Sequence, residues 1–208
     1  AASAKREGKL LRAEEARLAS DGKFNRAMEL YREARESNPF DADPHMEYAA
    51  LSLKLWERLR KMAGRDGRIV SRMAIAEAEV VNALEKALLA RPRSIPAESM
   101  LAHAHFRFAN HHRGNLAREK EHLDQARVHA TRTMLLYPTR AQAHYEAGRI
   151  FYRCRETREA QASFATALHL SANAEKEGLD RLQLNPVQKA RALFRLRRAK
   201  EARKLLRD

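Results

Sequence analysis

Apolar residues recur at every third or fourth position along most of the chain, and no segment alternates apolar and polar residues as a half-buried β-strand does. In an α-helix this spacing gathers the apolar side chains on one face, which can pack against a neighbouring helix. The sequence therefore predicts an all-α protein. The clearest apolar positions are Met46, Ala49, Ala50, Leu53 and Leu55, followed by Trp56, and then Ile75, Ala78, Val81, Leu84, Ala87 and Leu88.

Proline and glycine residues interrupt this pattern at intervals and divide it into pairs of helices. Pro39 and Pro92 are 53 residues apart, and Pro92 and Pro138 are 46 apart, so we expect elongated helices in both intervals. Gly64 and Gly67 mark the turn at the tip of the first of these hairpins. The expected pairs span residues 8–41, 42–94, 95–140 and 141–174, and a C-terminal capping pair spans 175–208.

Residues 141–174 contain small and aromatic residues at fixed spacing. His144, Ala147-Gly148 and Phe151 lie on the first helix of the pair, and Ala160-x-x-x-Phe164 lies on the second. Small residues let two helices approach closely, and aromatic rings fill the groove beside them. This order and spacing resemble the tetratricopeptide repeat family, whose period is about 34 residues.

The resemblance implies a tetratricopeptide-like helix-hairpin solenoid, with about four repeats plus the C-terminal capping helix pair, in a single domain over residues 1–208. The repeats at 42–94 and 95–140 would have the elongated hairpins. Capping residues predict two helix starts in addition. Thr139 and Gln142 have the spacing of a capping box, and Asn185-Pro186 is typical of a first helical turn.

The charge of the chain indicates acidic partners. It has 41 Lys and Arg residues against 27 Asp and Glu residues, a net charge of +14. An acidic peptide, nucleic acid or an anionic membrane surface would be attracted to such a chain, although a well-solvated arginine-rich surface has the same composition. The stretch from Lys189 to Arg207 is the most basic, and it is either the polar outer face of a capping helix or a binding site for phosphates.

Motifs of catalysis are absent from the sequence. It has no H-E-x-x-H, no G-x-S-x-G and no phosphate-binding glycine loop. His105 with His112 and His122 with His129 have a spacing that allows each pair to share a helix face, but spacing alone does not make a metal site. Cys154 is interpreted as an inert thiol. We therefore predict a protein that is not an enzyme and has no catalytic residue, cofactor or metal.

The resemblance also implies where a partner binds, because tetratricopeptide arrays hold partner segments in a concave groove lined by the first helix of each repeat. Tyr145, Arg149 and Tyr152 share one helix face, and arginine with tyrosine is typical of binding hot spots. Ala16 and Glu47 stand where the family's carboxylate clamp has asparagines, so a chaperone-tail clamp is excluded. The predicted partner-binding residues are Arg12, Met46, His103, Arg107, Tyr145, Arg149, Tyr152 and Arg153.

The function that follows is a non-catalytic protein-interaction scaffold that binds an acidic or mixed partner segment. One alternative is a helical array that binds RNA or an anionic surface through its basic segments. Another is a soluble appendage of a larger membrane-associated protein, because the irregular long hairpins resemble the tails of bacterial polysaccharide polymerases of the O-antigen ligase type. No apolar run is long enough to span a bilayer. We expect a soluble, cytoplasmic chain, or a periplasmic one if it belongs to such a larger protein.

Overall fold

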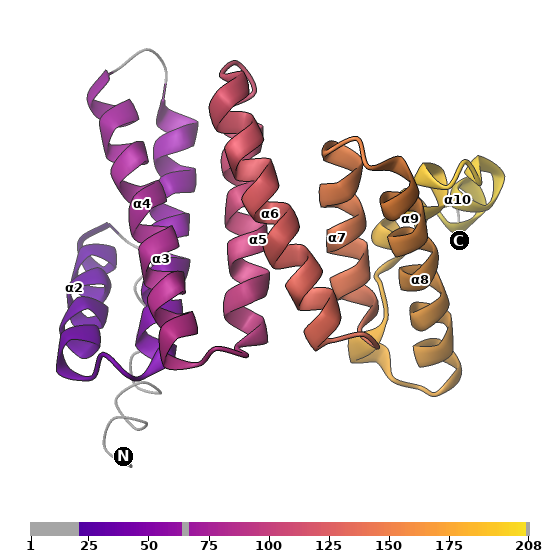
Figure 1. The fold of residues 1–208 in the computed structure, drawn as a ribbon, viewed down its shortest axis with the longest axis horizontal. Coiled ribbons are helices and arrows are strands. Elements are labelled where there is room, and N and C mark those ends of the chain that lie inside the picture. The colour runs from indigo at the N-terminus through magenta and orange to yellow at the C-terminus, as the bar shows by residue number, and fades with distance from the viewer. Residues whose placement is uncertain (1–20, 64–66, 207–208) are drawn as a thin grey trace. The chain divides into compact units, whose positions relative to one another are not determined.

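The computed structural model describes residues 21–63 and 67–206. The predicted contact residue Arg12 and most of the predicted turn at 64–67 lie outside these residues. Every regular element in the described ranges is a helix, so the predicted all-α fold is confirmed (Figure 1). Within the same ranges, no helix has both the length and the hydropathy that a membrane span needs.

The chain divides into two compact units, residues 1–97 and 98–208, and each is described by itself. The single-domain organisation therefore stays a prediction. In the first unit, α3 and α4 are long, with 21 and 24 residues, as the wide interval between Pro39 and Pro92 predicts. In the described part of this unit the helices are α2 (Asp21–Ser37), α3 (Ala42–Met62), α4 (Gly67–Ala90) and the first turn of α5 (Ile95–His111).

The second unit consists of successive helix pairs joined by short turns (Figure 1). The rest of α5 pairs with α6, α7 pairs with α8, and α9 pairs with α10. A 3-10 turn, η1, lies between α8 and α9. The elements after α5 are α6 (Leu116–Leu136), α7 (Ala141–Arg153), α8 (Thr157–Lys176), η1 (Asp180–Leu182), α9 (Pro186–Arg195) and α10 (Ala199–Leu205).

One of the two predicted helix starts is confirmed and the other is wrong. At α9, the side chain of Asn185 accepts a hydrogen bond from the backbone of Gln188 at 2.9 Å, and the Gln188 side chain accepts one in return from the Asn185 backbone at 3.1 Å. At α7 the N-cap is Arg140, and no side chain caps the helix. Because the N-cap is one residue later than the capping box of Thr139 and Gln142 requires, the third helical position is Ala143, which has no side-chain acceptor, and that capping box cannot form.

The buried faces of α3 and α4 differ from the predicted ones. Leu53 and Leu55 are only partly buried, whereas Trp56 and Leu59 are buried, and Ile75 is 60% exposed. Both helices have apolar residues on more than one face, so helical spacing alone does not say which face packs inward. The buried residues of α4 are Met73, Ala76, Val80, Ala83, Leu84 and Ala87.

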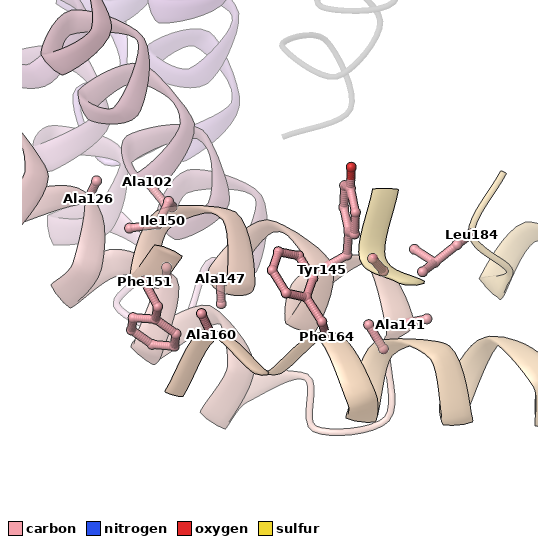
Figure 2. Close-up of a cluster of buried hydrophobic side chains, with 13 residues drawn as sticks. Ala102, Ala126, Ala141, Tyr145, Ala147, Ile150, Phe151, Ala160, Phe164 and Leu184 are labelled. Carbon is pink, nitrogen blue, oxygen red and sulfur yellow. The ribbon is translucent and has the colours of Figure 1, made fainter. Parts of the chain in front are cut away.

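The core of the second unit is built largely of alanines around a few aromatic rings (Figure 2). The rings of Tyr145 and Phe164 lie with their centroids 5.9 Å apart, and Phe151 packs in the same cluster. Alanine side chains on α7 and α8, such as Ala147 and Ala160, let the two helices approach closely. The small and aromatic residues that carry the sequence motif are therefore the ones that form this core.

Gly148 should not tolerate a larger side chain. A Cβ atom at this position would lie 2.9 Å from Cδ1 and Cε1 of the buried Phe164 ring, closer than atoms in van der Waals contact. Replacing Gly148 by leucine should therefore lower the free energy of unfolding by about 1–3 kcal/mol through overpacking. Thermal and urea unfolding measure this loss. Gly114→Leu is the matched control, since nothing lies within 4 Å of a Cβ atom there, and equal stability of the two variants would contradict the close approach of α7 and α8.

Candidate functional site

A row of basic and aromatic side chains crosses α5, α7 and α9 in the second unit. The guanidinium of Arg149 on α7 lies 5.1 Å from the centre of the Phe106 ring on α5. On the other side of α7, the guanidinium of Arg195 on α9 lies 3.9 Å from the centre of the Tyr152 ring. Each pair is within cation–π distance. We call this surface the α7 face, and it comprises His103, Phe106, Arg107, Glu146, Arg149, Tyr152 and Arg195.

Positive charge dominates the middle of the α7 face. Partial burial lowers the pKa of the Arg107 guanidinium, and the nearby charge of Arg149 lowers it further, while Glu146 opposes both effects. Burial likewise lowers the pKa of His103, so this imidazole is neutral at pH 7. The face thus places two arginine charges close together beside a single carboxylate.

Glu146 is the internal counterion of this surface. Its Oε2 accepts a hydrogen bond from Arg149 at 2.5 Å, and its Oε1 accepts one from the amide of Gln142 at 2.9 Å. The carbonyl of Gln142 in turn accepts a hydrogen bond from the Gln188 amide at 3.1 Å, which links α7 to α9. These contacts hold the first turns of the two helices together and orient Arg149.

The structure brings four of the predicted contact residues together on the α7 face: His103, Arg107, Arg149 and Tyr152. Tyr152 is 45% exposed and is available to a partner. Phe106 lies beside Arg149 on the same face. The arrangement spans α5 and α7, which are the first helices of two neighbouring pairs.

Two predicted contact residues of α7 lie elsewhere. Tyr145 is 2% exposed and packs in the core against Phe164 rather than on the surface (Figure 2). Arg153 donates a hydrogen bond through Nη2 to Glu119 on α6, whose side chain is largely buried. Tyr145 therefore supports the face from beneath, and Arg153 joins α7 to the preceding helix pair.

Met46 lies in the first unit, where it is half-buried. It packs against Ala42, Ala87 and Ala97, and its sulfur atom accepts a hydrogen bond from the Ser94 hydroxyl at 3.7 Å. Its side chain is thus occupied by packing between α3, α4 and the start of α5. This placement differs from that of a residue lining an open groove.

Sequence reasoning missed the contribution of α9 to this surface. Arg195 belongs to the basic C-terminal segment, and nothing in its local pattern distinguishes it from the arginines around it. A signal was nevertheless present, because α9 is the first helix of its pair, and applying the groove register of α7 to α9 would have included Arg195. Glu146 was missed because a lone carboxylate among basic residues has no motif.

The thiol of Cys154 does not have the features of a catalytic nucleophile. Burial raises its pKa to about 11, and the neighbouring carboxylate of Glu156 adds to the rise. The sulfur atom points toward the backbone carbonyl of Leu123, at 3.9 Å. A thiol with this pKa is protonated at pH 7, in keeping with the interpretation of Cys154 as an inert side chain.

A separate hollow of about 450 Å³ lies in the first unit. Arg35 donates a hydrogen bond to Nδ1 of the buried His45 at 3.0 Å, which leaves His45 Nε2 to donate to the Pro39 carbonyl at 3.2 Å. The Arg35 guanidinium also lies 4.2 Å from the centre of the Tyr48 ring. This arginine is therefore held by His45 and Tyr48 of its own unit. The hollow is lined by Arg32, Arg35, Glu36, Pro39, Phe40, His45, Lys86, Leu89 and Ala90.

Comparison with known proteins identifies the type of fold. No family model matches the sequence, and no curated protein sequence matches it. The crystal structure of TTC0263, a thermophilic TPR protein in Thermus thermophilus, is similar to this chain, with a TM-score of 0.61 and 20% sequence identity. The match covers 98% of this chain and 86% of the TTC0263 chain. Two crystal structures of MamA match with TM-scores of 0.57 and 0.56, at 14% and 16% identity. The first match covers 96% of this chain and 88% of the MamA chain, and the second covers 89% of this chain and 86% of the MamA chain. The likeness shows a helix-hairpin fold of the tetratricopeptide type.

Proposed function

Since the chain has a tetratricopeptide-type fold, we propose that it is a non-catalytic scaffold that binds an acidic, extended segment of a partner protein on the α7 face. The observation that carries the proposal is the proximity of Arg107 and Arg149 on a surface that also presents Phe106 and Tyr152. Helix pairs of this kind expose the first helix of each pair along one surface, which suits an extended chain.

The chemistry of the face favours carboxylates beside apolar anchors. An arginine guanidinium donates two parallel hydrogen bonds to a carboxylate, and such charge-assisted pairs are stronger than neutral ones. Tyr152 offers a large contact area and loses little conformational entropy on binding. A partner segment carrying Asp or Glu residues next to leucine or an aromatic residue would therefore match both kinds of group.

Glu146 should act as an internal competitor for the partner. Its carboxylate already accepts a hydrogen bond from Arg149, so an incoming carboxylate has to share or replace this contact. Removing the negative charge of Glu146 should then strengthen binding. General damage to the fold would weaken binding, so tighter binding after the loss of the Glu146 charge cannot be explained by such damage.

The test is a fluorescence-anisotropy titration with a labelled peptide that alternates Asp or Glu with leucine, compared with the same peptide carrying Asn and Gln. Arg107→Gln and Arg149→Gln should each weaken binding of the acidic peptide by about tenfold to thirtyfold, equivalent to about 1.4–2 kcal/mol. Glu146→Gln should tighten it. Arg158→Gln, which removes an exposed arginine of α8, is the matched control and should have little effect.

Two outcomes would overturn the proposal. Equal binding of the acidic and the amide peptide would show that carboxylates are not recognised. Unchanged affinity in both Arg107→Gln and Arg149→Gln, together with strong retention on nucleic acid that is lost when Arg191, Arg197, Lys200 and Lys204 are neutralised, would favour the basic C-terminal helices as the binding site. Part of the charge of those helices is already paired, since Lys189 contacts Glu175 and Arg198 contacts Glu201.

A further inference from the structure

Histidines gather between α5 and α6 in the second unit, in a place that the proposed function does not use. Nδ1 of His105 on α5 lies 3.1 Å from Nδ1 of His122 on α6, and the two ring centres are 5.3 Å apart. His112, the residue after α5, stacks on His122 with ring centres 5.4 Å apart. A ring nitrogen of His112 and one of His122 lie within 4.8 Å of each other. Their spacing along the sequence does not by itself predict a metal site, but the fold brings their nitrogen atoms together.

This geometry is close to the one that a transition-metal ion imposes. A tetrahedral ion bound at about 2.0–2.1 Å from each imidazole nitrogen places two ligand nitrogens roughly 3.3 Å apart. The nitrogen atoms of His105 and His122 are already near this separation. In the metal-free protein, one of these nitrogens donates a hydrogen bond to the other. Binding an ion through both Nδ1 atoms requires only that the proton of this hydrogen bond move to the Nε2 atom of the same ring.

The protonation state of His105 also suits a metal ligand. Burial, followed by the neighbouring His122 and His129, lowers its pKa to about 3, so the imidazole is neutral at pH 7. A neutral imidazole is the form that coordinates a metal ion. Burial falls from His105 to the half-buried His122 and His112, so an ion can approach from the His112 side.

Neighbouring side chains hold the rings in place. The ring of His129 stacks on His105 with an interplanar angle of 1°, and His129 itself contacts Glu98 at 2.6 Å. The Phe108 ring packs edge-on against His105 and His122. A shell of this kind fixes ring orientation, which is a requirement for tight metal binding.

We propose that His105, His112 and His122 bind one divalent transition-metal ion of the Zn²⁺ class, with water completing the coordination. One of these side chains rotates to bring its nitrogen to the ion when the ion binds. The ion connects α5 to α6, and it therefore stabilises this hairpin in addition to any effect on partner binding. The site is independent of the α7 face, and its failure would leave the scaffold proposal intact.

Isothermal titration of the untagged full chain with Zn²⁺, after treatment with a chelator, tests the site. We expect saturable binding of one ion per chain and a rise in melting temperature with Zn²⁺. His105→Gln, His112→Gln and His122→Gln should each weaken binding at least about tenfold and abolish the thermal shift. His144→Gln and His169→Gln remove histidines outside the cluster and should leave the affinity unchanged, and circular dichroism checks that each variant remains helical.

The wild-type chain provides a second measurement that does not depend on the folding of variants. Zn²⁺ should shift the imidazole ¹⁵N resonances of His105, His112 and His122 and leave those of His144 and His169 in place, and Co²⁺ should give the intense visible absorption of a tetrahedral ion. Absence of saturable binding, equal loss of affinity in the control variants, or shifts confined to other histidines would overturn the site. Full affinity in His112→Gln would overturn the three-histidine ligand set.

Discussion

Replacing Trp56 by alanine should lower the free energy of unfolding of the first unit by about 3–5 kcal/mol. The indole is 1% exposed between α3 and α4, and its Nε1 donates a hydrogen bond to Glu77 at 2.8 Å. Truncation leaves a large cavity between two long helices and removes the donor that the carboxylate contacts. Both losses act in the same direction, so this is among the largest effects that we expect from a single substitution.

Two further variants separate the contributions of packing and hydrogen bonding at Trp56. Trp56→Phe keeps most of the apolar volume but removes the indole donor, and it should cost about 1–3 kcal/mol. Phe40→Ala removes an aromatic side chain that is 85% exposed and should stay within about 0.5 kcal/mol of the original protein. Urea unfolding followed by circular dichroism measures all three, and equal stability of Trp56→Ala and Phe40→Ala would contradict the packing described for α3 and α4.

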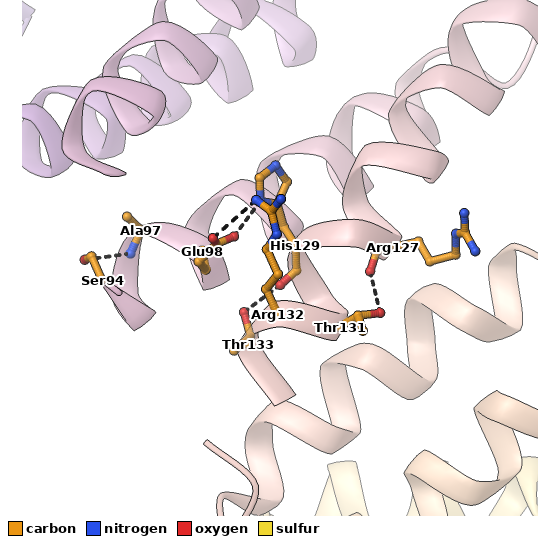
Figure 3. Close-up of polar contacts among 8 residues, drawn as sticks. All are labelled: Ser94, Ala97, Glu98, Arg127, His129, Thr131, Arg132 and Thr133. Carbon is orange, nitrogen blue, oxygen red and sulfur yellow. Dashed lines mark hydrogen bonds and ion pairs between the residues drawn. The ribbon is translucent and has the colours of Figure 1, made fainter. Parts of the chain in front are cut away.

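His129→Leu should destabilise the second unit by about 3–5 kcal/mol. His129 Nδ1 lies 2.6 Å from Oε2 of Glu98, and Glu98 is only 4% exposed (Figure 3). Leucine cannot donate a hydrogen bond, so the substitution leaves a buried carboxylate with the longer contact to Arg132, at 3.6 Å, as its remaining ion pair in the described part of the chain. The cost arises mainly from this uncompensated carboxylate.

A double-mutant cycle distinguishes that cause from simple loss of packing. Adding Glu98→Leu to His129→Leu removes the buried carboxylate, so the double variant should be more stable than His129→Leu alone. Arg132→Ala removes a partner whose side chain is 56% exposed and should cost less than about 1 kcal/mol. If the two leucine substitutions prove additive, the contact between Glu98 and His129 does not couple the helices as described.

Local sequence was sufficient for the helical fold and for the best-defined helix pair. The three-to-four spacing of apolar residues predicts helices because this spacing forms one apolar face. The pair at 141–174 was predictable in more detail, since Gly148, Ala160 and Phe164 must lie together for α7 and α8 to approach closely. In the structure, a Cβ atom added at Gly148 would meet the Phe164 ring at 2.9 Å. The capping box at Asn185 is equally local, because all of its hydrogen bonds lie within four residues.

The candidate site was predictable only in part. Helical register along α5 and α7 identified His103, Arg107, Arg149 and Tyr152, because residues three, four or seven apart on a helix share a face. It did not show that Tyr145, which belongs to the same stripe, faces Phe164 in the core. A residue at the edge of an apolar stripe is buried or exposed according to where the neighbouring helix lies. The sequence of a single helix does not determine that position.

What the sequence by itself determined, then, is the helical pattern, its division into pairs and the residues that bring one pair close together, because these depend on spacings of a few residues. Tertiary structure decided which face of α4 is buried, where Met73 is 2% exposed and Ile75 is 60% exposed. It also decided the pairing of Arg153 with Glu119 and of His105 with His122. These partners are on different helices, and only the packing of whole helices against one another brings such side chains within bonding distance.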